Sequence, residues 1–398
     1  MNTLRAFGTF LAIVFLTISC AACQPLEPDQ AVVLAVKTSG PIIQSYIAQN
    51  PQPTWTVSPV PTDLPTLLPV FRLTSTITPP PPPDARSQLA CEGAQAHSAA
   101  IRKLVFSPNG KVLASAGEDG TIKLWDYASG NLLLRLIGHE GAVNSIAFSP
   151  DNTALVSGGE DETVRLWDTA SGELRRTFIG HKGAVKAVLF SPDGSRIISG
   201  GSDYYLYVWD VDRENPLITK LIGQEGTILS LAYSMDNTQL YSAGEDGMII
   251  WWDLAEKRVV QRQSRQNGAV TSLAFRPDNR MMAGGGSDGS ISLWMPSAFE
   301  HLLNIAHSTQ PIRCVAFSAD GTLLAASGDS AAIEIYRLAD QTFLGMGGNH
   351  NAAVTSLVFS PDHLFLVSAG MDGAIKLWKT GIENLTSPAF ACFNDPNP

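Results

Sequence analysis

The chain has 398 residues, of which 44% are hydrophobic and 16% charged, a composition that indicates a folded globular protein and excludes a charge-rich coiled coil. The formal net charge is −10, and because the charges before residue 91 cancel, the acidic excess lies in residues 91–398. An acidic surface repels phosphate, so we expect no binding to nucleic acid.

Residues 1–22 are typical of an export signal. Their apolar run, residues 7–18, is shorter than a membrane-spanning helix requires. Two alanines precede Cys23, and small residues before a cysteine resemble the lipobox of bacterial lipoproteins, in which that cysteine carries the lipid. Cys23 fits this pattern best and Cys20 is the alternative. Simple secretion after cleavage at Ala22 and an uncleaved anchor are the competing interpretations.

Residues 23–86 have the composition of a tether. Of the 25 prolines in the chain, 14 lie between Pro25 and Pro83, among many threonines and few charges. Proline fixes φ and lacks an N–H, so such a segment favours extended geometry and builds no core. We therefore predict a Pro/Thr-rich disordered linker that holds a folded domain away from a surface.

The remaining residues repeat one unit seven times. Aromatic residues recur at steps of 42 or 43 residues, and each unit contains alternating apolar and polar positions separated by Ser-Pro-Asp-type turns. Alternation of this kind predicts about four short, half-buried strands in each unit. The recurring aromatic residues are Trp125, Trp167, Trp209, Trp252, Trp294, Tyr336 and Trp378.

These repeats resemble the WD-repeat β-propeller family. The Trp-Asp pair occurs at Trp125-Asp126 and in the next three units, and a Gly-His pair occurs at Gly138-His139 and Gly180-His181. The resemblance implies an all-β fold, a seven-bladed propeller of four-stranded antiparallel blades, over residues 87–393. It also implies that the chain is not an enzyme and forms a monomeric propeller.

The resemblance implies that a His, a Ser, an Asp and the Trp of each blade form a buried hydrogen-bonded tetrad. Blades 1, 2, 3 and 7 contain all four residues at the family's spacing. These tetrads are His97, Ser115, Asp119 and Trp125; His139, Ser157, Asp161 and Trp167; His181, Ser199, Asp203 and Trp209; and His350, Ser368, Asp372 and Trp378.

The other three blades depart from the pattern. Blade 4 has Gln224 at the His position, blade 5 has Gly284 at the Ser position, and blade 6 has none of the four. A His-Asp-Ser set also suggests a hydrolase, but one active site needs one exposed nucleophile, whereas these sets recur around a ring with a tryptophan. No phosphate loop or metal-ligand spacing is present, so we expect no catalytic residue, no metal and no cofactor.

Cysteines lie at both ends of the repeat region. In this family the last blade usually takes its outer strand from the N-terminal side, which implies that residues 87–96 form that strand beside residues 381–393. We expect a Cys91–Cys392 disulfide at this junction, because export places the protein in an oxidising compartment. The alternative is that the two thiols are not bonded to each other.

Family propellers bind peptides or proteins mostly on the face that carries the turns between strands, and side chains beside the tetrad aspartates often contribute. The resemblance therefore implies a role for Glu118, Glu160 and Glu245, whose charge favours a basic partner. Tyr204 replaces a turn glycine and is followed by Tyr205, and exposed tyrosines are good interface anchors. Solvated turns and outer-face packing are the alternative interpretations.

The sequence thus predicts a noncatalytic protein-interaction platform outside the cytoplasmic membrane, held there by a lipid on its N-terminus or secreted. The alternatives are a small-ligand receptor or enzyme that uses the propeller channel, and the sensory head of an envelope signalling complex. The partner, an unknown protein or peptide, is not identified by the sequence.

Overall fold

The structure is a computed structural model that describes residues 95–234, 239–264, 267–379, 393 and 395. The expected signal peptide (1–22), the linker (23–86) and both cysteines of the expected disulfide, Cys91 and Cys392, lie outside these residues. In the part of the chain that is described, no helix is long and apolar enough to cross a membrane.

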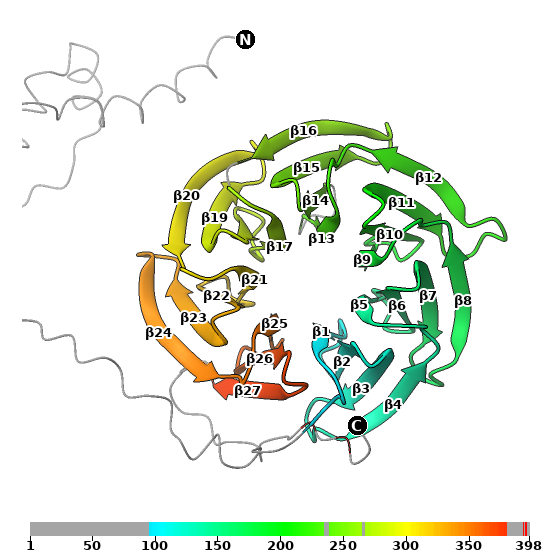
Figure 1. The fold of residues 1–398 in the computed structure, drawn as a ribbon, viewed down its shortest axis with the longest axis horizontal. Coiled ribbons are helices and arrows are strands. Elements are labelled where there is room, and N and C mark those ends of the chain that lie inside the picture. The colour runs from blue at the N-terminus through cyan, green and yellow to red at the C-terminus, as the bar shows by residue number, and fades with distance from the viewer. Residues whose placement is uncertain (1–94, 235–238, 265–266, 380–392, 394, 396–398) are drawn as a thin grey trace, which may run out of the picture. The chain divides into compact units, whose positions relative to one another are not determined.

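Seven antiparallel sheets, the blades, are arranged around a common axis (Figure 1). The strands of blades 1 to 3 are β1 (Ile101–Phe106), β2 (Val112–Gly117), β3 (Thr121–Asp126) and β4 (Leu132–Ile137); β5 (Val143–Phe148), β6 (Ala154–Gly159), β7 (Thr163–Asp168) and β8 (Leu174–Ile179); and β9 (Val185–Phe190), β10 (Arg196–Gly201), β11 (Tyr205–Asp210) and β12 (Leu217–Ile222).

Blades 4 to 7 continue the same pattern. Their strands are β13 (Ile228–Tyr233), β14 (Leu240–Gly244), β15 (Met248–Asp253) and β16 (Arg258–Ser264); β17 (Val270–Phe275), β18 (Met282–Gly286), β19 (Ser290–Met295) and β20 (Glu300–His307); β21 (Ile312–Phe317), β22 (Leu323–Gly328), β23 (Ala332–Arg337) and β24 (Thr342–Asn349); and β25 (Val354–Phe359), β26 (Phe365–Gly370) and β27 (Ile375–Lys379).

The first strand of each blade lies next to the axis and the fourth lies at the rim (Figure 1). Six blades have four strands, and blade 7 has three among the described residues. The expected seven-bladed β-propeller is therefore confirmed. The expected outer strand of blade 7, residues 87–96, lies almost wholly outside the described residues and stays a prediction.

Alternating side chains of neighbouring blades pack against each other and form the core. The cluster between blades 1 and 2, for example, contains Leu124, Ile146 and Trp167, which are 1–2% exposed. One sheet alone leaves one apolar face in water, whereas seven sheets around an axis bury both faces of each. Burial between blades is thus what makes the ring the stable arrangement of this repeat.

The ring has two faces with different turns. The turns between the second and third strands carry the tetrad aspartates, and we call this side the Asp face. The turns between the first and second strands lie on the opposite face. There Ser149 Oγ donates to Asp151 Oδ1 at 2.5 Å and accepts from Ala154 N at 2.9 Å, which closes the predicted Ser-Pro-Asp turn.

Candidate functional site

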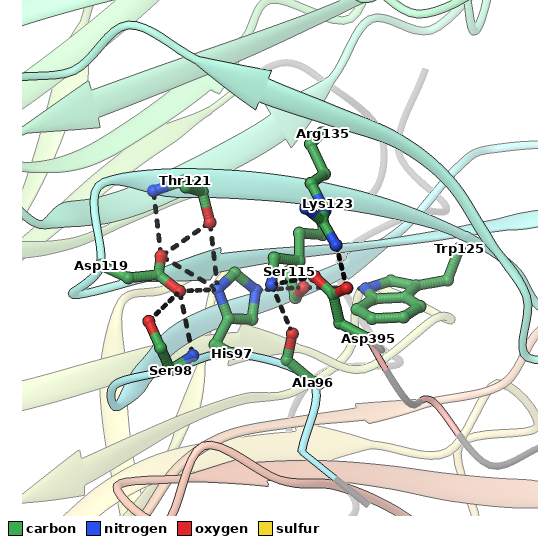
Figure 2. Close-up of polar contacts among 10 residues, drawn as sticks. All are labelled: Ala96, His97, Ser98, Ser115, Asp119, Thr121, Lys123, Trp125, Arg135 and Asp395. Carbon is green, nitrogen blue, oxygen red and sulfur yellow. Dashed lines mark hydrogen bonds and ion pairs between the residues drawn. The ribbon is translucent and has the colours of Figure 1, made fainter. Parts of the chain in front are cut away.

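The four predicted tetrad residues of blade 1 form one continuous chain of hydrogen bonds (Figure 2). Trp125 Nε1 donates to Ser115 Oγ at 2.9 Å. The same serine oxygen lies 2.7 Å from His97 Nε2. His97 Nδ1 in turn lies 2.9 Å from Asp119 Oδ2. Ser115 and His97 are both fully buried. The network therefore connects an indole in the core to a carboxylate on the Asp face.

The same geometry recurs in blades 2, 3 and 7. The Trp–Ser distances are 2.8, 2.8 and 2.7 Å, the Ser–His distances are all 2.7 Å, and the His–Asp distances are 2.9, 3.0 and 2.9 Å. The participating residues are His139, Ser157, Asp161 and Trp167; His181, Ser199, Asp203 and Trp209; and His350, Ser368, Asp372 and Trp378.

Burial determines the charge state of these networks. It lowers the pKa of His97 and His139, although the neighbouring carboxylates oppose that shift. Burial opposes ionisation of Asp372, but the hydrogen bond and charge of His350 outweigh it and lower the pKa of Asp372 to about 2. At neutral pH the imidazoles of His97 and His139 are consequently uncharged, and the carboxylate of Asp372 is ionised.

Blade 4 completes the same network with an amide. Ser242 Oγ donates to Gln224 Oε1 at 2.8 Å, Gln224 Nε2 donates to Asp246 Oδ1 at 2.7 Å, and Trp252 Nε1 donates to Ser242 Oγ at 2.8 Å. The amide oxygen and nitrogen thus take the two roles of the imidazole nitrogens. Gln224 therefore preserves the network without a group that titrates.

The glutamine of blade 4 suggests a pH-insensitive variant of blade 2. Because burial lowers the pKa of His139, the unfolded chain binds more protons than the folded one below about pH 6.5, and stability falls as the pH drops. His139→Gln is expected to change the free energy of unfolding by less than about 1 kcal/mol at pH 7.5 and to reduce its loss between pH 7 and pH 5. Urea unfolding at several pH values measures this, and an unchanged pH slope would contradict it.

Blade 5 leaves the tryptophan without its acceptor. Gly284 occupies the serine position, and among the described residues the buried Trp294 Nε1 has no hydrogen-bond partner. A Cβ added at Gly284 would lie 3.6 Å from Val270 Cγ1 and 3.7 Å from Trp294 Nε1, which is ordinary contact. The site therefore has room for a serine side chain beside the orphaned indole N–H.

We expect Gly284→Ser to stabilise the protein by about 1–2 kcal/mol relative to Gly284→Ala, because its hydroxyl can accept from the buried indole of Trp294. The alanine variant is the matched control, since it adds the same Cβ without an acceptor. Urea denaturation of the two variants gives the difference. Equal stability of the two would show that the hydroxyl makes no bond to the indole.

Blade 6 replaces the tetrad with a different pair. Tyr336 occupies the tryptophan position, and its hydroxyl donates to Glu334 Oε2 at 2.6 Å within the sheet. Burial and the Glu334 carboxylate together raise the pKa of Tyr336, so its hydroxyl remains protonated. The sequence showed which tetrad residues are missing from this blade but not that a Tyr–Glu pair takes their place.

The C-terminal residues attach to blade 1 at the junction with blade 7 (Figure 2). Lys123 Nζ lies 2.6 Å from Asp395 Oδ2 and donates to Ala96 O at 2.8 Å, and Arg135 forms a second ion pair with Asp395. Phe393 packs edge-on against Trp125 at 5.8 Å between ring centroids. Asp395, which lies beyond the predicted end of the propeller, thus pairs in the core with the buried Lys123 and, at the edge of the core, with the partly exposed Arg135.

Phe393 supplies the aromatic ring that packs against the tetrad tryptophan of blade 1. Between blades 2 and 3 the outer strand of the preceding blade supplies this ring, since Phe178 of β8 packs against Trp209 at 5.7 Å between ring centroids. Blade 1 has no preceding blade in the chain order. The amide of Asp395 also donates to Gln95 O at 3.0 Å, so the two ends of the described propeller are directly bonded.

The inner strands are bonded to each other from blade to blade. Serines at the third position of these strands accept a hydrogen bond from a backbone N–H of the next blade at 3.0–3.3 Å. These serines are Ser145, Ser230, Ser272 and Ser356. Cys314 and Lys103 occupy the position in blades 6 and 1, and burial raises the pKa of the Cys314 thiol to about 12. These four serines therefore bond each inner strand to the inner strand of the next blade.

The acidic residues predicted to bind a partner lie on the Asp face, where two of the three are already paired. Glu118 forms an ion pair with Arg102, and Glu160 Oε1 lies 2.5 Å from Lys186 Nζ of the next blade. Glu245 is exposed. The negative charge available to a basic partner on this face is thus smaller than the sequence indicates.

The two predicted tyrosines have different surroundings. Tyr204 is 48% exposed and has a positive φ of 66°, the conformation that glycine adopts in the equivalent turn of blade 1. Lys220 Nζ covers the ring of Tyr205 at 3.3 Å from its centroid. Tyr204 is consequently available to a partner, whereas outer-face packing accounts for Tyr205.

Three exposed isoleucines lie at equivalent positions of blades 1, 2 and 3. They are the last residues of β4, β8 and β12, where the outer strand reaches the Asp face. They were not among the residues predicted from the sequence. Ile137, Ile179 and Ile222 are 72%, 80% and 75% exposed. We call them the isoleucine arc. The sequence does contain a signal for these positions, because an isoleucine directly precedes each of the Gly-His or Gly-Gln pairs that follow β4, β8 and β12.

Seven radial blades with a recurring Trp-Ser-His-Asp network define the WD-repeat class of β-propeller. A family model described as "IFT122 first beta-propeller" matches residues 143–389, more than half of the chain, and one described as "WD domain, G-beta repeat" matches residues 91–126. The chain therefore belongs to the family of WD-repeat β-propellers that these models describe. No curated protein matches it.

Proposed function

We propose that this protein is a noncatalytic platform that binds a partner protein through the Asp-face side of blades 1 to 3. The isoleucine arc carries this proposal, because three large apolar side chains exposed by 72–80% cost free energy in water unless a partner covers them. Tyr204 of blade 3 is exposed on the same face. Propellers of this family commonly serve as interaction scaffolds.

The tetrads support a noncatalytic role. Each tetrad serine accepts from an indole and contacts an imidazole, and Ser115, Ser157 and Ser199 are completely buried. A nucleophile must reach its substrate, and these hydroxyls do not. The inner-strand serines Ser145, Ser230, Ser272 and Ser356 each accept a bond from the next blade, which likewise argues against an enzyme or receptor site built from them.

The experiment compares partner capture by the intact protein and by surface variants. Ile179→Ser/Ile222→Ser and Tyr204→Ala are expected to lower recovery of the bound partner from the protein's own cell envelope at least tenfold, without a change in the unfolding midpoint. Leu302→Ser, at a side chain 39% exposed on blade 5, is the matched control. Unchanged capture by the isoleucine and tyrosine variants would contradict the proposed surface.

The proposal places this platform outside the cytoplasmic membrane on a lipid attached to Cys23, with residues 23–86 as its tether. The alanines before Cys23 and the apolar run before them support it. Palmitate labelling is expected to disappear in Cys23→Ser and to persist in Cys20→Ser. The reverse result would move the lipid to Cys20, and no labelling of the intact chain would favour simple secretion.

A further inference from the structure

Aromatic side chains gather at the outer corner of blade 3 on the Asp face. Tyr204 lies in the turn between β10 and β11, and Tyr205 begins β11. Across the sheet Tyr205 is paired with Ile222, and Tyr207 is paired with Lys220. Directly opposite residues, and residues two apart in a strand, project from the same face of a sheet, so these four side chains lie on one side of the blade. The equivalents of Tyr204 and Tyr205 in blades 1, 2 and 4 are Gly120 and Thr121, Glu162 and Thr163, and Gly247 and Met248.

This corner combines exposed apolar surface with a positioned cation. Ile222 is 75% exposed and Tyr204 is 48% exposed. Tyr205 is only partly exposed, and Lys220 Nζ lies 3.3 Å from the centroid of its ring and 5.5 Å from that of Tyr207. The cation–π contact holds the ammonium at the surface beside the apolar side chains.

A second lysine lies beside the same turn. Lys182 N donates to Asp203 Oδ2 at 3.0 Å, and this aspartate directly precedes Tyr204. Lys182 and Lys220 are both exposed, and neither forms an ion pair with another of the described residues. We call this set the blade 3 patch, and its members are Lys182, Tyr204, Tyr205, Lys220 and Ile222.

The carboxylates around the patch are engaged or belong to other turns. The side chain of Asp203 is 4% exposed and lies 3.0 Å from the tetrad histidine. Glu140 and Glu225 are exposed, but their N–H groups donate to Asp161 of blade 2 and Asp246 of blade 4. The blade 3 patch is therefore cationic, although the domain as a whole is acidic.

We infer that the blade 3 patch binds a segment of the partner protein in which Asp or Glu stands next to large apolar side chains. Ile222 and the ring of Tyr204 cover the apolar side chains, and the two ammonium groups pair with the carboxylates. A cation already held over a ring loses less freedom on binding than an unrestrained one. The inference rests on the proposed platform function and adds the chemistry of the partner, opposite in charge to the basic partner that the sequence favoured.

A random dodecapeptide library displayed on phage is the probe. Selection on the immobilised protein is expected to enrich peptides in which acidic residues stand next to large aliphatic or aromatic ones. The double variant Lys182→Glu/Lys220→Glu is expected to lose these peptides and to enrich basic ones instead. Lys111→Glu reverses the charge of an exposed lysine on the opposite face, and this matched control is expected to select the same peptides as the native chain.

Fluorescence anisotropy of one enriched, fluorescein-labelled peptide then gives its affinity. The double variant is expected to bind this peptide at least tenfold more weakly at an unchanged unfolding midpoint, and the native chain to lose at least tenfold when glutamine replaces the acidic residues of the peptide. Enrichment of basic peptides by the native chain, no enrichment, or equal affinity in the double variant would overturn the inference.

Partner capture separates this inference from the proposed function. Capture that is lost in Ile179→Ser/Ile222→Ser but unchanged in Lys182→Glu/Lys220→Glu would overturn the acidic segment and leave the platform in place. Capture that is unchanged in the isoleucine and tyrosine variants would overturn the platform itself, so the two failures are distinguishable.

Discussion

Asp395→Ala is expected to lower the free energy of unfolding by about 3–5 kcal/mol, the usual cost of removing one partner from a buried ion pair. Asp395 and Lys123 have side chains 0% and 2% exposed, and their charged atoms lie 2.6 Å apart. Without the carboxylate, the ammonium of Lys123 is left in the core with only the carbonyl of Ala96. Urea denaturation at neutral pH measures the loss.

Two further variants identify the cause of this loss. Asp340→Ala breaks a surface pair with Arg337 in which both side chains are about half exposed, and it is expected to cost far less than Asp395→Ala. Lys123→Met in the Asp395→Ala background removes the unpaired charge and is expected to restore part of the lost stability. If Asp395→Ala itself costs no more than Asp340→Ala, the C-terminal residues do not hold the junction.

Ser157→Ala is expected to cost about 2–4 kcal/mol, because it removes the hydroxyl at the centre of a complete tetrad. Trp167 Nε1 and His139 Nε2 lie 2.8 and 2.7 Å from Ser157 Oγ, and both lose their partner at once. Each buried polar group left without a hydrogen bond costs about 1–3 kcal/mol. The decrease is measured as the change in the free energy of urea unfolding.

Ser145→Ala is the matched control for this prediction. Ser145, on the inner strand β5, is also buried, but among the described residues its hydroxyl accepts a single bond, from Val188 N at 3.1 Å, so its loss is expected to cost about 1 kcal/mol. In a Trp167→Phe background, which lacks the indole N–H, Ser157→Ala is expected to cost less than in the native chain. Equal costs in the two backgrounds would mean that the Trp–Ser bond contributes nothing.

The repeat made much of this structure predictable. A spacing of 42 or 43 residues places chemically equivalent residues at equivalent points of each blade, so the Trp125 network could be located in blades 2, 3 and 7 by counting. Strand alternation predicted the short strands of each unit, although not that the ring buries both faces of each sheet. These features depend on contacts within one blade or between identical neighbours, and the sequence of one unit contains them.

Departures from the repeat were recognised in the sequence, but their consequences were not. Gln224 replaces a histidine, yet its amide restores the network, whereas Gly284 leaves the indole N–H of Trp294 without a partner among the described residues. The difference depends on whether an atom is within bonding distance in three dimensions. The same holds for Glu118, whose charge the sequence shows but whose pairing with Arg102 it does not.

By itself, the sequence determined the number of blades, the strand pattern and four complete tetrads, because each arises from interactions that repeat every 42 or 43 residues. The tertiary structure alone decided how the described C-terminal residues join the ring, since Asp395 meets Lys123 across 272 positions of chain.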